Sequence, residues 1–317
     1  MLHESDPADG QPLQLTLDVP LQELAERILA DVGPASALVA IDPASGDILA
    51  AASGPGGDGQ NTATYGRYAP GSTMKVVTAL ALMRSGLKPG SMVDCPATTV
   101  VDGKTFKNYD DYPASSLGRI TLREAIAQSC NTALVGLAEE LDDDGLEEAA
   151  AALGLGVDHD LGFPAYFGQV PPPEGKTEKA ADLIGQGKVL ASPMAMATVA
   201  ASVRAGHTVL PSLVDGNEVE QVEPAVPLTA AEAKALRGLM RAVVTDGSGR
   251  FLDGMGADLG AKTGTAEHGT PDAGGELPTH VWMIAQRKGM AVAVFVEDGA
   301  SGSQTAGPLL QQFLAES

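Results

Sequence analysis

The chain has 317 residues, of which 44% are hydrophobic, so it can bury a sizeable core and is not a disordered protein. Its 41 acidic residues outnumber its 20 basic ones, and the resulting net charge of −21 would repel a phosphate backbone, which excludes general nucleic-acid binding. No apolar run approaches the roughly 18 residues that a membrane span needs. The N-terminal segment MLHESDPADGQ is polar and lacks a signal-peptide core.

The first predicted elements are one helix and two strands. Asp18 is expected to cap a helix with Pro20 in its first turn, and Gly33 is expected to end it. Residues 37–41 and 47–52 have the composition of strands, and the sequence DPASG between them is typical of a turn. These two strands should therefore form a hairpin.

The middle of the chain is predicted to be helical. Thr121 with Glu124 and Thr229 with Glu232 have the spacing of capping boxes, which mark helix starts. A further helix should begin at Ser192-Pro193 and end at Gly206. We expect these helices to form one lobe.

Strands return near the C-terminus, at 259–267, 280–286 and 290–297, and a last helix is expected over roughly 305–315. Short connections favour antiparallel pairing. We therefore expect a mixed α/β fold: a five-stranded, mainly antiparallel sheet flanked by the terminal helices, with an all-helical lobe inserted into it. A single domain over 1–317 would contain a sheet part at about 12–60 and 240–317 and a lobe at about 70–235. The cleft between the two parts is the expected place for a site.

The stretch YAPGSTMKVV places Ser72 in the first turn of a predicted helix and Lys75 one turn later on the same face. A buried lysine near a helix N-terminus is driven toward its neutral form by desolvation and by the helix dipole. A neutral amine beside a hydroxyl is a general base beside a nucleophile. The competing interpretation is a capping serine and a lysine that reaches solvent.

Two more polar clusters can be read in the same way. Ser129 and Asn131 flank Cys130 at a helix junction, where a hydroxyl and an amide could face one cleft. Lys262, Thr263, Gly264 and Thr265 lie on the first C-terminal strand, where Gly264 leaves room for a close approach to the backbone. An edge of this kind can hold an extended peptide, with the lysine and threonines on its carboxylate. Taken singly, these clusters also fit a polar helix junction and an ordinary exposed strand.

Together, Ser-x-x-Lys, Ser-x-Asn and Lys-Thr-Gly in this order resemble the motifs of the penicillin-binding transpeptidases, most closely those of the monofunctional class B. The resemblance extends over nearly the whole chain, through the segments LTLDVPLQ, AIDPASGDILAAAS, YAPGSTMK, SCNTA, GQGKVLASPMAMA, GAKTGTAE and HVW. It implies a peptidoglycan D,D-transpeptidase that acts on D-Ala-D-Ala stem peptides through an acyl-serine and that β-lactam antibiotics acylate.

The resemblance also implies residue roles. Ser72 would be the nucleophile, Lys75 its general base, and Ser129 the relay that passes a proton to the leaving amine. Asn131 would bond the substrate amide. The segment Lys262, Thr263, Gly264 and Thr265 would bind the substrate, its lysine and threonines holding the terminal carboxylate. Backbone N–H groups of Ser72 and Thr265 would form the oxyanion hole.

The implied partners are stem peptides, β-lactams and a membrane glycan polymerase, with no nucleic acid, metal or cofactor. Class B proteins carry a membrane anchor and an N-terminal pedestal domain, neither of which is found in this sequence. We therefore expect a soluble part of a longer, extracytoplasmic and membrane-anchored protein.

Two points are left open by the sequence. Cys95 and Cys130 are expected to be free thiols, because a residue inside the second motif is an improbable partner for a disulfide. The motif set also fits a D,D-carboxypeptidase or a serine β-lactamase of the same fold, or a β-lactam sensor or catalytically weak scaffold protein. No Glu-x-x-x-Asn segment of the class A β-lactamase kind lies between the second and third motifs, which argues against efficient hydrolysis of the acyl-enzyme.

Overall fold

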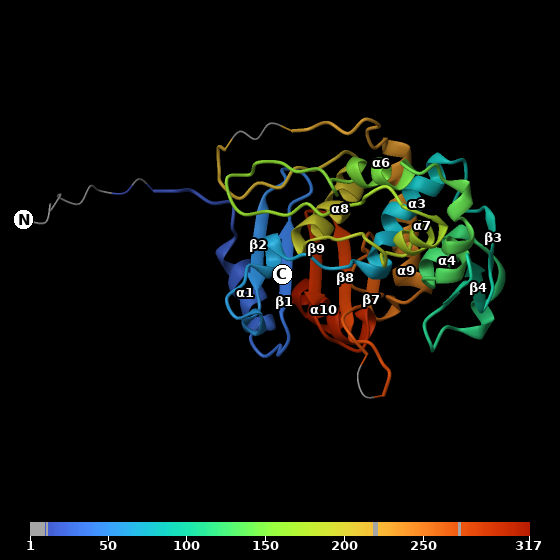
Figure 1. The fold of residues 1–317 in the computed structure, drawn as a ribbon. Coiled ribbons are helices and arrows are strands. Elements are labelled where there is room, and N and C mark those ends of the chain that lie inside the picture. The colour runs from blue at the N-terminus through green and yellow to red at the C-terminus, as the bar shows by residue number, and fades with distance from the viewer. Residues whose placement is uncertain (1–9, 11, 218–220, 272–273) are drawn as a thin grey trace, which may run out of the picture.

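The computed structural model describes residues 10, 12–217, 221–271 and 274–317, so nearly all of the polar N-terminal segment MLHESDPADGQ lies outside the described residues. A five-stranded sheet in the order β2-β1-β9-β8-β7, with every neighbouring pair antiparallel, runs through the molecule (Figure 1). Its strands are β1 Ser36–Ile41, β2 Ile48–Ser53, β7 Gly260–Glu267, β8 Thr279–Arg287 and β9 Met290–Val296. The predicted strands and their antiparallel pairing are confirmed.

Ten helices are found in the described part of the chain, and most of them lie between β2 and β7 in the sequence. They are α1 Val19–Leu29, α2 Thr62–Tyr65, α3 Lys75–Arg84, α4 Leu122–Ala127, α5 Asn131–Gly136, α6 Gly145–Ala152, α7 Lys176–Asp182, α8 Pro193–Ala205, α9 Ala230–Asp246 and α10 Gly307–Glu316. Short 3-10 turns include η2 Gly71–Met74, directly before α3, and a π turn, η6 Gly302–Ala306, precedes α10. Within the described ranges, no helix is both long and apolar enough to cross a membrane.

The sheet separates two hydrophobic cores. On one face, α1 and α10 pack through side chains such as Leu29 and Phe313 against inward-facing residues such as Val294. On the other face, α8 and the helices beyond it pack against residues such as Phe295 and Trp282. Trp282 is fully buried, as expected for a core residue. The terminal helices therefore flank the sheet, and the inserted helices occupy its opposite face and the space beyond β7 (Figure 1).

The helix starts follow the sequence signals closely. The side chain of Asp18 accepts a hydrogen bond from the backbone N–H of Leu21 at 3.1 Å, which caps α1. Both capping boxes, at the starts of α4 and α9, are present in full. Ser192 caps α8, and Gly206, with φ +88°, ends it in the left-handed conformation that glycine adopts without strain.

The inserted segment differs from the expected all-helical lobe. It also contains four short strands, β3 Met92–Cys95, β4 Thr98–Val101, β5 Lys104–Lys107 and β6 Gly118–Thr121, which form two separate two-stranded sheets. Their side chains are mostly exposed or half-buried, so they lack the continuous apolar pattern that marks the central strands. The helical prediction for this segment is wrong in that respect.

Candidate active site

Ser72 lies in the turn η2, which β7 contacts closely. Gly71 has φ +52°, and a Cβ on it would collide with the carbonyl oxygen of Thr265. Thr73 donates a hydrogen bond from its hydroxyl to the carbonyl of Pro70 at 2.7 Å, which stabilises the turn. Ser72 itself is half-buried between buried neighbours. The first motif is thus held against the strand that carries the third.

Lys75 is the first residue of α3 and is fully buried, as its inward position in the sequence pattern predicts. Its amine donates to the Ser129 carbonyl at 2.7 Å, to the Ser129 hydroxyl at 3.1 Å and to the Asn131 side-chain oxygen at 2.6 Å. The first and second motifs are therefore in direct contact. Among the described residues, the Lys75 amine makes no hydrogen bond to the Ser72 hydroxyl.

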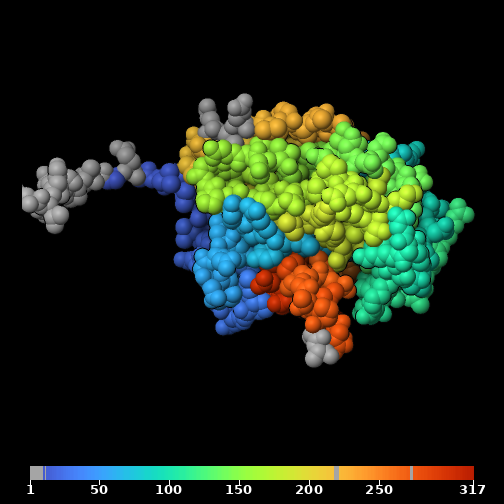
Figure 2. All heavy atoms as spheres, viewed as in Figure 1, coloured from blue at the N-terminus to red at the C-terminus, as the bar shows by residue number. Residues whose placement is uncertain are grey.

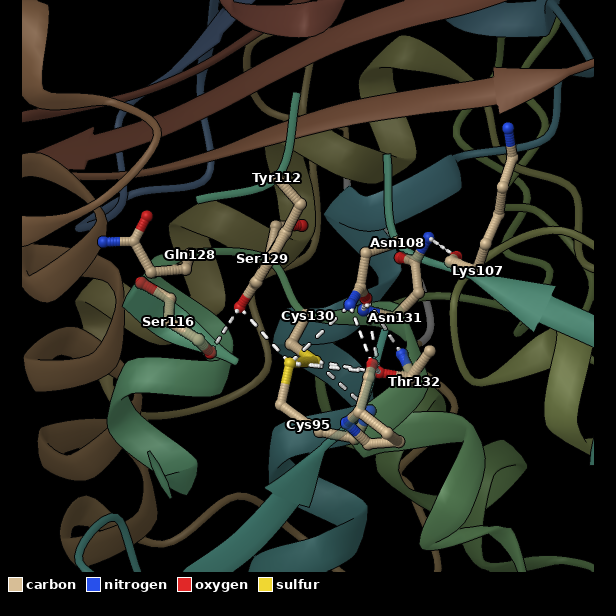
Figure 3. The surroundings of a disulfide bond; sticks show 12 residues. Cys95, Lys107, Asn108, Tyr112, Ser116, Gln128, Ser129, Cys130, Asn131 and Thr132 are labelled. Atoms are coloured by element: carbon tan, nitrogen blue, oxygen red, sulfur yellow. Dashed lines mark hydrogen bonds between the residues drawn. A yellow bond between two sulfur atoms is a disulfide. The ribbon is translucent and has the colours of Figure 1, made fainter. Parts of the chain in front are cut away.

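The Ser129–Asn131 segment joins α4 to α5. Ser129 has φ +59°, a left-handed conformation that is uncommon for a residue with a side chain. The side-chain oxygen of Asn108 accepts hydrogen bonds from the backbone N–H groups of Asn131, at 2.8 Å, and Thr132, at 3.2 Å (Figure 3). The Asn131 amide donates to the carbonyl of Lys107 at 3.0 Å. These contacts fix a strained segment in one conformation.

Cys130, between these two polar residues, forms a disulfide with Cys95 at the end of β3 (Figure 3). The expectation of free thiols is wrong. Ser129 and Asn131 both point to Lys75, so the intervening Cys130 side chain points the other way, into the lobe, where both cysteines are fully buried. The Cα atoms of the pair lie 6.4 Å apart, within the usual range for a disulfide.

The disulfide should contribute measurably to stability, because it closes a loop with a sequence separation of 35 residues. We expect the double variant Cys95→Ala/Cys130→Ala to lose about 3–4 kcal/mol of unfolding free energy, chiefly because its unfolded chain is less constrained. Urea denaturation of the variant and of the oxidised wild-type chain measures the difference. A loss below about 1 kcal/mol would mean that the crosslink adds little to the hydrogen bonds already present in the segment.

The third motif lies on β7. The Lys262 amine is fully buried and donates to the Ser129 hydroxyl at 2.9 Å and to the Thr263 carbonyl at 2.9 Å. The Thr263 hydroxyl lies 2.8 Å from the hydroxyl of Ser248. A Cβ on Gly264 would lie 2.8 Å from the Thr73 methyl and 2.9 Å from the Pro70 carbonyl, so the close approach expected at this glycine is that of the turn η2.

The Ser129 hydroxyl consequently lies between two buried amines, those of Lys75 and Lys262. Burial lowers the pKa of Lys75 well below its usual value, and the nearby charge of Lys262 lowers it further. Burial lowers the pKa of Lys262 to about 7. Among the described residues, no carboxylate bonds to either amine, so no anion offsets the effect of burial on the two pKa values.

The molecular surface is hollowed between the segment that follows β7 and the β3–β6 region. Figure 2 shows a recess between the orange segment that follows β7 and the teal segments of the β3–β6 region. Thr265, half-buried on β7, donates no side-chain hydrogen bond in the described structure, and its hydroxyl accepts one from the Gly302 N–H at 3.2 Å. Ser72 and Thr265 are thus partly exposed, whereas Lys75, Ser129 and Lys262 are buried.

The family model for the penicillin-binding protein transpeptidase domain matches residues 36–315. This chain belongs to that family. The resemblance read from the three motifs is therefore confirmed, and so is the fold that it implied.

Known members of the penicillin-binding transpeptidase family are similar along most of the chain. The peptidoglycan D,D-transpeptidase PbpA of Mycolicibacterium smegmatis is 32% identical over 326 residues, an alignment that covers 86% of this chain and 65% of PbpA. The chain thus spans slightly less than two thirds of the length of that relative. Penicillin-binding protein A of Mycobacterium tuberculosis, solved as a ceftriaxone acyl-enzyme complex, superposes with a TM-score of 0.84 at 27% identity, over 96% of this chain and 79% of that one.

A second similar structure is described as showing the structural coordination of polymerization and crosslinking by a peptidoglycan synthase complex. It superposes with a TM-score of 0.81 at 29% identity and covers 99% of this chain and 64% of that chain. Nearly all of this chain therefore superposes on that structure.

Sequence reasoning missed several residues that shape this site. Asn108 lies in a loop, and nothing in its neighbourhood distinguishes it as an acceptor for the first N–H groups of α5. Ser248, which contacts Thr263, follows a helix end without any motif. Cys95 did carry a signal, because two cysteines in one chain can pair, but the motif context led to the opposite expectation.

Proposed function

We propose that this chain is the transpeptidase domain of a peptidoglycan-crosslinking enzyme, a serine acyltransferase that cleaves the D-Ala-D-Ala end of a stem peptide and that β-lactams acylate covalently. The observation that carries the proposal is the meeting of three motifs, remote in sequence, at one buried hydroxyl, that of Ser129. The single domain over 1–317, with its sheet part at about 12–60 and 240–317 and its lobe at about 70–235, is part of this proposal.

Acylation begins with attack of the Ser72 oxygen on the carbonyl carbon of the penultimate D-Ala. Because burial and the charge of Lys262 lower its pKa, Lys75 first loses one of the protons that it shares with Ser129 and Asn131, and the neutral amine then takes the hydroxyl proton. The negative charge that develops on the carbonyl oxygen is stabilised by the backbone N–H groups of Ser72 and Thr265. The contact of Gly71 with the Thr265 carbonyl supports this pairing, because it brings the two backbone segments together.

Breakdown of the tetrahedral intermediate requires a proton on the leaving amine. Ser129 is suited to this step, because its hydroxyl can donate to the leaving nitrogen while it accepts a replacement proton from Lys75 at 3.1 Å. Lys262, at 2.9 Å, stabilises the hydroxyl oxygen during the transfer. The C–N bond breaks, the terminal D-Ala departs as an amine, and the acyl group stays on Ser72.

Substrate binding uses the remaining residues. Asn131, whose side-chain amide contacts Lys75 and Lys107, bonds the substrate amide. Lys262, Thr263 and Thr265 supply a positive charge and two hydroxyls for the terminal carboxylate, and Gly264 lets the turn that carries Ser72 pack closely against β7. In the second half of the reaction, an amine of a neighbouring strand attacks the acyl-serine and forms the crosslink.

The location and partners follow from the same reaction. Peptidoglycan lies outside the cytoplasmic membrane, so we propose an extracytoplasmic protein that is anchored to the membrane in its full-length form and works with a glycan polymerase. The disulfide supports an oxidising compartment. The similar structure described as a peptidoglycan synthase complex supports a polymerase partner.

Incubation with a fluorescent penicillin and, separately, with a chromogenic cephalosporin tests the function. We expect a stable label on Ser72 and slow turnover of the cephalosporin, since the chain has no Glu-x-x-x-Asn segment to activate water. Peptide mapping after protease digestion locates the label, and absorbance follows turnover.

Each alternative predicts a different result. Rapid cephalosporin turnover would identify a serine β-lactamase, and release of D-Ala from a pentapeptide without transfer to an added amine would identify a carboxypeptidase. A stable label without any action on peptides would favour a sensor or scaffold. Absence of any label would defeat the proposal.

A further inference from the structure

The turn that carries Ser72 is held from two sides. β7 lies on one side, through Thr265, and the loop 185–188 lies on the other. The Gly71 N–H donates to the Gly185 carbonyl at 2.9 Å, and a Cβ on Gly185 would collide with the Gly71 carbonyl. Any shift of this loop is therefore transmitted to the residue immediately before Ser72.

The loop is in turn held by Asp182, the last residue of α7. The Asp182 backbone carbonyl accepts from the Gly185 N–H at 3.0 Å, and one carboxylate oxygen, Oδ1, accepts from the Lys188 N–H at 3.0 Å. The backbone of Gly187 passes so close that a Cβ there would collide with Oδ1. The Asp182 side chain therefore fills the inside of the loop and fixes its course.

Burying the Asp182 carboxylate at this position is energetically unfavourable. Its side chain is only 2% exposed, and its second oxygen, Oδ2, has no hydrogen-bond partner among the described residues. The charged groups nearest to it are Glu178 on α7 and Lys188 on the loop, and the Lys188 ammonium pairs with Glu174 and Glu178 instead. A group that served only to end α7 would not need a buried carboxylate.

The end of α7 is also fixed to the helix that carries Lys75. The Thr78 hydroxyl on α3 donates to the Leu183 carbonyl at 2.7 Å. The loop is therefore anchored at its start to α3 and held through its interior by Asp182. Both contacts therefore hold the loop whose Gly185 carbonyl bonds to Gly71.

We propose that Asp182 is a positioning residue for Ser72: its carboxylate holds the loop 185–188 against Gly71 and so sets the height of the nucleophile turn relative to β7. This inference rests on the proposed acylation of Ser72. Asp182 does not touch the substrate and acts only through the loop.

The test compares Asp182→Ala with Asp182→Asn in time courses of acylation by a fluorescent penicillin at several concentrations. Alanine removes the acceptor for the Lys188 N–H, and we expect the limiting acylation rate to fall roughly 10- to 100-fold with little change in the half-saturating concentration. Asparagine retains Oδ1 as an acceptor and should restore the rate to within about threefold of wild type. This rescue separates positioning by the hydrogen bond from a general need for charge.

The matched control is Val203→Ala, which removes buried volume in α8 away from the loop and should lower the melting temperature without slowing acylation. If Asp182→Ala does not fold, Gly187→Ala replaces it, because its Cβ displaces Oδ1 while the carboxylate remains. Acylation of Asp182→Ala or Gly187→Ala at the wild-type rate, or equal slowing in Val203→Ala, would overturn the inference. Failure of the wild-type chain to label at all would instead overturn the proposed function.

Discussion

Replacing Ser72 by alanine is expected to abolish labelling by penicillin, to less than about one part in 10⁴ of the wild-type rate, because the other hydroxyl of the turn η2, that of Thr73, is buried and bonded to the Pro70 carbonyl. The variant should fold normally. Ser72 is half-buried, and among the described residues its hydroxyl makes no hydrogen bond, so its loss should change the free energy of unfolding by less than about 0.5 kcal/mol. Gel fluorescence after incubation with labelled penicillin, with thermal unfolding in parallel, measures both quantities.

Ser45→Ala, in the exposed turn between β1 and β2, is the matched control and should label like the wild-type chain. We expect the Ser72→Ala variant to show no penicillin labelling and an unchanged melting temperature. Persistent labelling of a folded Ser72→Ala chain would place the nucleophile elsewhere and remove the basis of the proposed mechanism.

Replacing Lys75 by alanine is expected to slow acylation by about 10²- to 10⁴-fold, the usual contribution of a general base. Lys75→Arg should be similarly slow, because a guanidinium stays protonated and cannot accept the serine proton. The rate constant of penicillin labelling under single-turnover conditions measures both variants, and Lys234→Ala on the exposed face of α9 is the control.

The pH dependence gives an independent check on Lys75. Burial lowers its pKa, so the neutral amine is the form present at and above the lowered value, and protonation on the acid side removes the base. Wild-type acylation should therefore fall as the pH drops through the titration of the buried amine pair. An arginine variant that kept the wild-type rate would contradict base catalysis by Lys75 and favour a purely electrostatic role.

The central sheet could be predicted from the sequence because its strands are short, apolar and bounded by turn residues. The helix starts could be predicted equally well, since Asp18 and the two capping boxes are local signals that need no tertiary context. The strands β4 and β5 could not be predicted, because their residues are mostly exposed or half-buried and carry little apolar pattern. The elements that could be predicted are thus those that carry a capping signal or an apolar pattern in their own sequence.

The candidate site could be predicted only in part from the sequence, for a similar reason. The motifs identified the polar residues, but their spacing did not reveal that the Lys75 amine would bond Ser129 and Asn131 and make no hydrogen bond to Ser72. The disulfide was missed because the direction of the Cys130 side chain depends on the positive φ of Ser129, which no sequence pattern indicates. Contacts between distant segments, such as Asn108 with α5, arise only once the lobe is packed.

Three glycines allow backbone segments to pack closely around the turn that carries the proposed nucleophile. A methyl group on Gly71, Gly264 or Gly302 would overlap backbone atoms of a neighbouring segment. A substitution at any of these glycines would therefore displace the turn that carries Ser72. Under the proposed function, variants with reduced antibiotic sensitivity that still build cell wall should change residues around the rim of the recess and leave these glycines unaltered.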